Sequence, residues 1–440
     1  MGPINNTFMF KIYLRQAWNL VKQNKLFTSI YVIGTGLAIA LTMILFIVHY
    51  IKFAPIYPEE NRGRTLVIKA MEANTEEGRN SQGCCSPYLS KVLEGLPHLE
   101  AIAVADHQWM LSPSEVSNPG EINGLKTIVR HVNDGFWQVF TFRFLAGKPF
   151  TKADMDAKQQ VAVVQEEVAL QLFGTTEAVG KRLICGDKEF RVVGVVENSS
   201  VAAPDSYAGV WIPATLSLQY EDEMANREHF IGLFTINLLS TSRADNDLLK
   251  EEVREAIRQY DADNTQWKHN PWGQPVEHWV SLYQSQTELN IKEVVLDLLY
   301  LLLAMLFIPA LNLSGMISSR MDHRLVEIGV RKAYGASNAS ILRQVLSENL
   351  VLTVAGGLVG LLLAYLIILT CSHWILGLFD NLGLYAFAES SPRITADMLL
   401  NPWVFGSAFG ACLLLNFISA FIPTVWALRH SIIESLHSKL

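Results

Sequence analysis

The chain has 440 residues, of which 50% are hydrophobic and only 18% are charged, and its formal net charge is −7. It is too apolar for an ordinary soluble protein and too charged to lie wholly within a membrane, so we expect it to be divided between the two. The acidic balance also argues against a nucleic-acid partner, because surfaces that bind nucleic acid are basic.

Residues 1–28 are predicted to form a cytoplasmic amphipathic helix at the inner membrane interface. Apolar residues recur there at helical spacing among the basic residues Lys11, Arg15 and Lys22. A plain cytosolic helix is the alternative.

Ala38-Ile39-Ala40 fits a signal-peptide cleavage pattern, but it lies in the middle of a longer apolar run. We therefore interpret this run as an uncleaved anchor.

Four charge-free apolar runs are long enough to cross a bilayer as helices. They are Ser29 to Tyr50, Leu298 to Ser319, Leu350 to Thr370, and Trp403 to Leu428. Together with their immediate flanks, they predict four transmembrane segments, at 29–50, 294–319, 349–371 and 403–428.

The charges beside these runs predict their orientation. The stretch before the first run has four basic residues and no acid, and the loop 320–348 has five basic residues against three acidic ones. Because cytoplasmic flanks carry an excess of Lys and Arg, both stretches should be cytoplasmic. Residues 51–293 and the short loop 372–402 then lie outside, and the tail 429–440 lies inside.

The exported segment 51–293 holds 34 acidic and 23 basic residues, a net charge of −11, and is long enough for two subdomains. Val161 to Gly174 is typical of a strand followed by a helix. A hairpin is predicted with strands 181–185 and 190–196 around a Gly186-Asp187 turn. Asp245 to Tyr260 should be an amphipathic helix, with one face formed by Leu248, Leu249, Val253, Ala256 and Ile257. We therefore expect an α+β domain.

Two groups of residues in this domain leave alternatives open. Trp267, Trp272 and Trp279 lie close in sequence and could bind a ligand, although packing at a subdomain joint is the more common role of such residues. Cys185 could pair with Cys84 or Cys85 in an oxidising compartment, and free thiols are the alternative.

The polar stretch from Met321 to Glu348 combines cationic, helix-forming and turn-forming signals. Glu327 lies four residues before Arg331, a spacing that supports an exposed helix. Gly335 should end that helix in the left-handed conformation. Ser337 or Ser340 could then cap a second helix, whose apolar side is formed by Ile341, Leu342, Val345 and Leu346. The sequence predicts a hairpin of two helices that runs directly into the next transmembrane segment.

At this stretch the chain resembles a known family. EIGVRKAYGAS followed by ILRQVLSENLVL resembles the signature of MacB/FtsX-type permeases of ABC transporters. The order FLAGKPF, LFG, VGKRL and FRVVGVVEN in the exported segment is similar to the MacB-like periplasmic core domain. The resemblance implies a polytopic α-helical membrane protein with four transmembrane helices and a large periplasmic domain of two subdomains.

The motifs of common enzymes are not found. Gly174 to Arg182 has five residues between its glycines where a phosphate-binding P-loop has four, and Arg182 stands where a Mg²⁺-binding Ser or Thr is needed. No GxxxxGK[ST], GxSxG or HExxH motif and no zinc-ligand spacing occurs elsewhere. We expect no catalytic, cofactor-binding or metal-binding residue in this chain, so ATP and Mg²⁺ should be bound by a separate ATPase.

The family resemblance implies that the chain transmits ATP-driven motion of a cytoplasmic ATPase to its periplasmic domain. The docking residues would then be Arg324, Glu327, Ile328, Val330, Arg331, Lys332, Ala333, Gly335 and Ala336. Helix packing is assigned to Gly356, Gly360, Gly406 and Gly410, whose small size allows close approach. The other expected partners are a second permease copy or a relative, and a periplasmic adaptor.

The expected location is the bacterial inner membrane, with both termini cytoplasmic. Export or extraction of a peptide, an antibiotic or a lipoprotein is the first function considered. An FtsX-like role in controlling an envelope partner, such as a cell-wall hydrolase, and a sensor without an ATPase are the alternatives.

Overall fold

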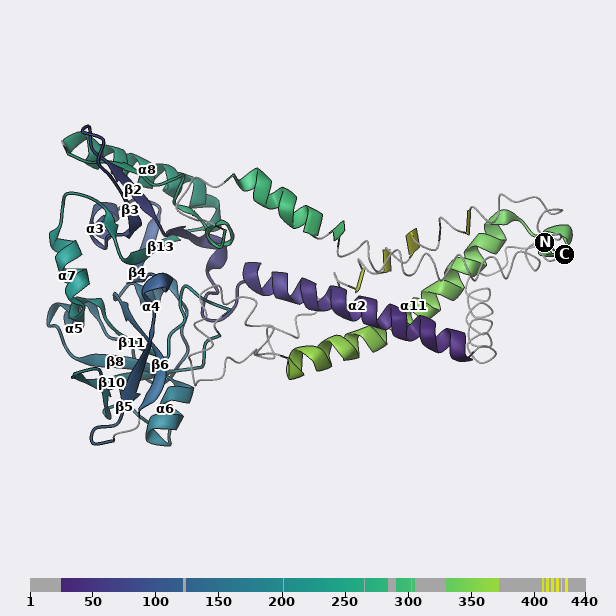
Figure 1. Cartoon of the computed structure of the whole chain (residues 1–440), viewed down its shortest axis with the longest axis horizontal. Coiled ribbons are helices and arrows are strands. Elements are labelled where there is room, and N and C mark those ends of the chain that lie inside the picture. The colour runs from purple at the N-terminus through teal and green to yellow at the C-terminus, as the bar shows by residue number, and fades with distance from the viewer. Residues whose placement is uncertain are drawn as a thin grey trace. The chain divides into compact units, whose positions relative to one another are not determined.

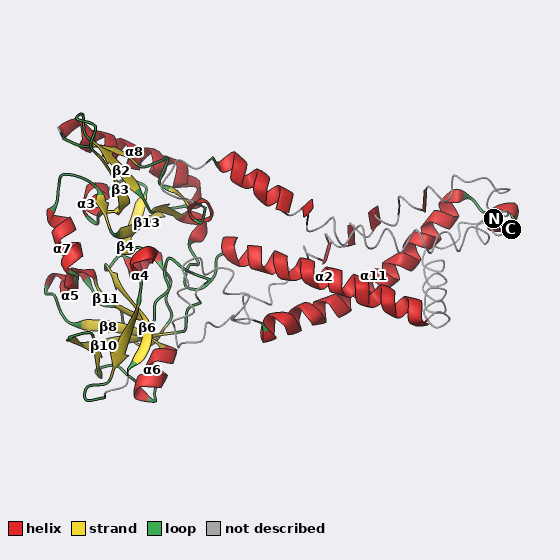
Figure 2. Cartoon of the chain, viewed as in Figure 1, coloured by secondary structure: helices red, strands yellow, loops and turns green. Residues whose placement is uncertain are grey.

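The computed structural model describes residues 25–121, 124–200, 202–264, 266–283, 290–301, 303–304 and 330–371, and scattered residues between 406 and 425. The chain divides into two compact units. Unit 1 comprises residues 1–50, 295–371 and 399–440, and unit 2 comprises residues 51–294 and 372–398. The described part of unit 1 is helical, and the described strands all belong to unit 2 (Figure 1, Figure 2).

Two long helices dominate the described part of unit 1. Helix α2 (Lys25–Phe53) contains the whole first predicted transmembrane run, and α11 (Asn338–Thr370) contains the third. Within the described residues one segment, Thr353–Thr370, is long and apolar enough to span a membrane, with a mean hydropathy of 2.2. The N-terminal amphipathic helix, the loop 372–402, the tail 429–440, and most of the second and fourth predicted segments lie outside the described residues.

Small residues bring α2 and α11 close together. A Cβ atom placed on Gly360 would lie 2.6 Å from the carbonyl oxygen of Gly36, and one on Gly356 would lie 2.9 Å from the side chain of Thr35. Beside this contact, Ile39, Ala40, Met43 and Ala364 form a buried apolar cluster. Among the described residues nothing lies within 4 Å of a Cβ placed on Gly406 or Gly410.

Gly360→Leu is expected to separate α2 from α11, because the new side chain would meet backbone that cannot rotate away. Overpacking of this kind costs about 1–3 kcal/mol. The measurement is the thermal unfolding of the full chain in lipid nanodiscs. Leu362→Ala is the control, since Leu362 is 68% exposed and its truncation should cost less than about 0.5 kcal/mol. Equal effects of the two substitutions would contradict the close helix contact.

Unit 2 contains two hydrophobic cores. Antiparallel strands form the sheet of the first core, where β1 pairs with β13 in the register Thr65↔Leu239 and β13 pairs with β4. Its strands are β1 (Thr65–Ile68), β2 (Met71–Asn74), β3 (Asn80–Cys85), β4 (Leu99–Asp106), β12 (Ile231–Gly232), β13 (Phe234–Ser240), β14 (Lys268–Asn270) and β15 (Val276–Glu277). Helices α3 (Tyr88–Leu93) and α8 (Asn246–Asp263) cover this sheet with Leu89, Leu93, Leu249, Val253 and Ile257 (Figure 1).

The second core lies in a mixed sheet, in which β8 runs parallel to β10 and β6 runs parallel to β11. Its strands are β5 (Pro113–Ser117), β6 (Leu125–Val132), β7 (Phe144–Gly147), β8 (Val161–Gln165), β9 (Arg182–Cys185), β10 (Lys188–Val196) and β11 (Val210–Pro213). The remaining helices of unit 2 are α4 (Phe136–Val139), α5 (Lys152–Asp156), α6 (Glu166–Phe173), α7 (Leu218–Ala225) and α9 (His278–Ser281). Of these, α9 follows β15 of the first sheet. The pairing of Ala105 in β4 with Val132 in β6 joins the two sheets.

Most of the local elements expected in this domain are present. Strand β8 is followed directly by α6, which ends at Gly174 with φ 69°. The predicted hairpin is β9 and β10, with Cys185 opposite Lys188. Of the expected face of α8, Leu249, Val253 and Ile257 are buried and Ala256 is half-buried, whereas Leu248 is 51% exposed. That expectation was wrong because the buried face follows the i, i+4, i+8 positions Leu249, Val253 and Ile257, and Leu248 lies to one side of it.

The three tryptophans pack against other residues of unit 2, and the three cysteines of this domain are free thiols. Trp272 is buried, Trp279 packs edge-on against Phe53, and Trp267 contacts the ring of His229. Cys84, Cys85 and Cys185 are free, with the first two in the sheet of the first core and Cys185 in the sheet of the second. The disulfide alternative is therefore not realised in this structure.

Candidate functional site

The described part of the predicted docking loop begins with the end of a helix, at residues 330–333. Gly335 follows with φ 86°. Its N–H donates to the Lys332 carbonyl at 2.9 Å, and the Ala336 N–H donates to the Arg331 carbonyl at 3.0 Å. These two bonds form a Schellman cap, which requires the left-handed conformation at Gly335. The predicted helix end is confirmed.

The second helix of the hairpin starts where one of the two expected serines caps it. The Ser337 hydroxyl accepts a hydrogen bond from the Ser340 N–H, and α11 then continues without a break to Thr370. Ile341 and Val345 are buried. The Arg331 guanidinium donates a hydrogen bond to the side-chain oxygen of Gln344 and so connects the two helices of the hairpin.

The turn of this hairpin presents apolar side chains outward. Tyr334 is 90% exposed, Val330 is 43% exposed, and Ala333 is exposed as well. Tyr334 is not among the predicted docking residues, because the sequence alone does not separate an exposed tyrosine from a buried one. Arg324, Glu327 and Ile328 lie outside the described residues.

Sequence reasoning missed a second site altogether, a group of buried charges in unit 2. We call Glu59, Arg62, Lys69, Asp205 and His278 the basal ion cluster. Arg62 is 6% exposed, and its Nη1 atom donates to the carbonyl oxygens of Ile51 at 2.7 Å and Ala54 at 2.8 Å. Its Nη2 atom donates to the Ala202 carbonyl at 2.9 Å. The guanidinium therefore connects the end of α2 to a loop 140 residues away in sequence.

The Glu59 carboxylate completes this connection. One oxygen forms an ion pair with Arg62 at 2.8 Å, and the other accepts bonds from the N–H groups of Asp205 and Ser206, at 2.9 and 3.0 Å. Burial by itself would raise the pKa of Glu59, but Arg62 and His278 outweigh burial and hold the pKa well below its usual range. The carboxylate is therefore charged while fully buried.

Asp205 links the cluster to two further segments. Its carboxylate lies 3.3 Å from Lys69 Nζ, just after β1, and 3.4 Å from Nε2 of His278, the first residue of α9. His278 Nε2 also lies 3.1 Å from Glu59. Three segments distant in sequence, at residues 51–69, 202–206 and 278, thus meet around two buried carboxylates.

The raised pKa of Glu223, on α7, should make the stability of the chain depend on pH. Burial, with a further contribution from Asp106, raises the pKa of Glu223 from its usual 4.5 to about 7. Because the folded-state pKa is raised, the protonated form favours folding, and this contribution is lost as pH rises from about 4.5 through 7. Glu223→Gln should therefore raise the melting temperature at pH 8 and change it little at pH 5.

The measurement is the melting temperature of the full chain between pH 5 and 8. Glu76→Gln, on an exposed turn, is the control and should have no effect at either pH. A difference between Glu223→Gln and the unaltered chain that does not change with pH would contradict the raised pKa.

Taken together, these features describe a chain with one large α+β domain and, among the described residues, one helix long and apolar enough to span a membrane. Two family models match it in succession. The MacB-like periplasmic core domain matches residues 28–256, which is more than half of the chain, and the FtsX-like permease C-terminal model matches residues 299–432. The chain therefore belongs to the MacB/FtsX-type family of ABC transporter permeases, which confirms the resemblance of its sequence motifs.

Individual relatives agree with this assignment. The chain is 28% identical over 285 residues to the macrolide export ATP-binding/permease protein MacB 1 of Aeromonas hydrophila, a match that covers 62% of this chain and 41% of the relative. It is 21% identical over 312 residues to the uncharacterised ABC transporter permease YknZ of Bacillus subtilis, covering 69% of this chain and 72% of that one. The chain thus spans about two fifths of the MacB protein and most of YknZ.

Two solved structures align with about half of this chain, both at low sequence identity and a low TM-score. The periplasmic region of MacB from Actinobacillus actinomycetemcomitans aligns over 48% of this chain and 92% of that structure, at 15% identity and a TM-score of 0.33. The extracellular domain of YknZ aligns over 46% of this chain and 98% of that structure, at 13% identity and a TM-score of 0.32.

Proposed function

We propose that this chain is the permease subunit of a bacterial ABC transporter that passes ATP-driven motion of a cytoplasmic ATPase to its periplasmic domain. The observation that supports this function is the bonding of Arg62 to both the end of α2 and the Ala202 carbonyl. Packed protein interiors transmit displacement because they are nearly incompressible. A shift of α2 would therefore move the loop around residues 202–206.

The hairpin 330–345 is the docking site in this proposal. Its exposed Tyr334 and Val330 supply apolar contacts, and Arg331 and Lys332 supply positive charge. Because the Schellman cap and the bond from Arg331 to Gln344 stiffen the hairpin, a push on its turn would be passed along α11. The chain itself is non-catalytic, and ATP and Mg²⁺ are bound by the ATPase.

The further parts of the proposal follow from the family. Two copies of the chain, or this chain and a related permease, associate in the inner membrane with four spans each and both termini in the cytoplasm. A periplasmic adaptor is an additional partner. The cargo class, a peptide, an antibiotic or a lipoprotein, is proposed by analogy with the macrolide export named for the MacB relatives.

The match to the FtsX-like model supports a second candidate, in which the same motion switches an envelope partner such as a cell-wall hydrolase. Cargo export and partner control differ in what stimulates the ATPase. A transported compound should accelerate ATP hydrolysis in the first case, and only the envelope partner should do so in the second.

The proposal is tested by hydrogen exchange of the full chain in lipid nanodiscs together with its ATPase. Trapping the ATPase with ATP and vanadate should change exchange at residues 51–54 and 202–206, the two segments that Arg62 joins. A control segment, the β2–β3 turn at residues 75–79, should not change. If the ATPase does not bind, or binds and leaves both segments unchanged, motion is not transmitted and the sensor alternative is favoured.

A further inference from the structure

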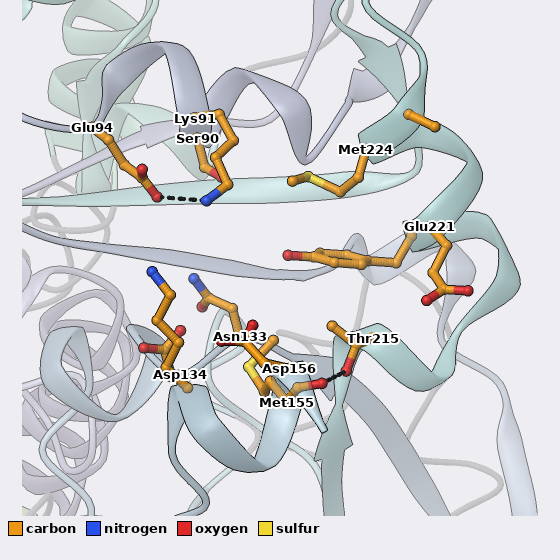
Figure 3. A pocket seen from close by; sticks show the side chains of 13 residues that line it. Ser90, Lys91, Glu94, Asn133, Asp134, Met155, Asp156, Thr215, Glu221 and Met224 are labelled. Atoms are coloured by element: carbon orange, nitrogen blue, oxygen red, sulfur yellow. Dashed lines mark hydrogen bonds and ion pairs between the residues drawn. The ribbon is translucent and has the colours of Figure 1, made fainter. Parts of the chain in front are cut away.

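A cleft of about 380 Å³ lies between the two cores of unit 2. One wall is formed by α3 and α7, and the other by α5 and the residues that follow β6. Figure 3 shows Lys91, Glu94 and Met224 on the first wall and Asn133, Asp134, Met155, Asp156 and Thr215 on the second. A volume of this size is within the range of cavities that take small molecules.

The charges of this cleft are predominantly negative. Four carboxylates line it, from Glu94, Asp134, Asp156 and Glu221, against the two ammonium groups of Lys91 and Lys152. Lys91 is already paired with Glu94 at 3.2 Å, and Glu221 is paired with Lys158 outside the cleft. In the described part of the chain, the side chains of Asp134 and Asp156 have no ion pair or hydrogen-bond partner.

Tyr220 is an independent sign of a ligand. It lines the cleft and is only 9% exposed, and its ring packs edge-on against Phe234. Among the described residues its hydroxyl has no hydrogen-bond partner. Burial first, and then the charges of Asp134, Glu94 and Asp156, raise the pKa of Tyr220 to about 12, so the hydroxyl lies in a negative field. A buried phenol among carboxylates is suited to a partner that carries positive charge.

The remaining lining indicates what surrounds that charge. Met155 and Met224 give the two walls flexible apolar surfaces that adapt to irregular shapes. Within the described residues no three His, Cys, Asp or Glu side chains gather closely enough to hold a metal ion, so the carboxylates are spread around the cleft. We infer that the cleft binds a small organic cation, a protonated amine on an apolar body, with Asp134 and Asp156 facing the amine and Tyr220 accepting its hydrogen bond.

The test uses the full chain in lipid nanodiscs with ¹³C-methyl methionine, so that Met155 and Met224 report on the cleft. The probe is 2-phenylethylamine, and its neutral counterpart is 2-phenylethanol. The amine should shift the signals of Met155 and Met224 and leave the other methionines in place. The alcohol should bind at least about tenfold more weakly, because it lacks the charge. No ATPase is needed, so the outcome is independent of the proposed function.

The double substitution Asp134→Asn and Asp156→Asn should lower the affinity for the amine at least about tenfold while the alcohol binds as before. Tyr220→Phe should lower it about threefold. Glu76→Gln, distant in the fold, is the matched control for loss of one surface carboxylate and should change nothing. Unchanged methionine signals elsewhere show that each variant is folded. Equal binding of amine and alcohol, or of the double variant and the unaltered chain, would overturn the inference, as would a lack of any shift with the amine.

Discussion

Arg62→Met is expected to lower the free energy of unfolding by about 3–5 kcal/mol, because it leaves the Glu59 carboxylate buried without its charged partner. It also removes three bonds to backbone carbonyls, at Ile51, Ala54 and Ala202. The measurement is chemical or thermal unfolding of the full chain, followed by tryptophan fluorescence. Arg79→Met is the matched control, since its pair with Glu77 is exposed and should be worth less than about 1 kcal/mol.

Two further observations separate a buried ion pair from general damage. Adding Glu59→Gln to Arg62→Met should recover part of the stability, because the uncompensated charge is removed. The unaltered chain should also lose stability as pH falls below about 4.5, because the pKa of Glu59 is lowered on folding. Its stabilising effect is complete only above the unfolded value and is lost progressively as the pH falls toward the lower folded value. Additive losses in the double variant would show that the two side chains do not act together.

Tyr334→Ala is expected to weaken ATPase docking by about 2 kcal/mol, a loss typical of exposed aromatic anchors that become buried in an interface. Its own fold should not suffer, because the side chain is 90% exposed in the free chain. Binding is measured between the ATPase and the full chain in nanodiscs, together with the rate of ATP hydrolysis. Asn338→Ala, on the exposed first turn of α11, should be nearly silent.

Gly335→Val should act by a different route. Its backbone has φ 86°, which a β-branched residue strongly resists, so the Schellman cap should open at a cost of about 1 kcal/mol or more. We expect ATPase binding to persist in weakened form while control of ATP hydrolysis is lost. Arg331→Glu should impair both, because it reverses a charge at the turn and breaks the bond to Gln344. Full binding and full control in Tyr334→Ala and Arg331→Glu would reduce the hairpin to a topological anchor.

The hairpin could be predicted closely because its structure is local. Gly335 follows a basic helical turn and Ser337 precedes an apolar periodic run, and each of these signals acts within four residues. The same holds for the strand, helix and glycine from Val161 to Gly174. Tyr334 was missed because exposure is a property of the folded surface, and a tyrosine in a sequence does not show whether it is buried.

The cleft and the basal ion cluster could not be predicted in this way. Asp134, Asp156 and Tyr220 come from three separate segments, and each is an ordinary polar residue in its own sequence context. Leu248 shows the same limit within a single helix, because only the neighbours of α8 decide which edge of its apolar face is covered.

Hydrophobic runs and turn residues in the sequence alone determined the long helices and the α+β domain, and the resemblance of its motifs indicated the family. These signals suffice because apolar length, periodicity and capping act through neighbours along the chain. The tertiary structure alone decided that Arg62 bonds Ile51, Ala54 and Ala202 and that Glu59, Asp205 and His278 share one buried site. A charge can be buried only where partners from distant segments surround it, and that arrangement exists only once the chain has folded.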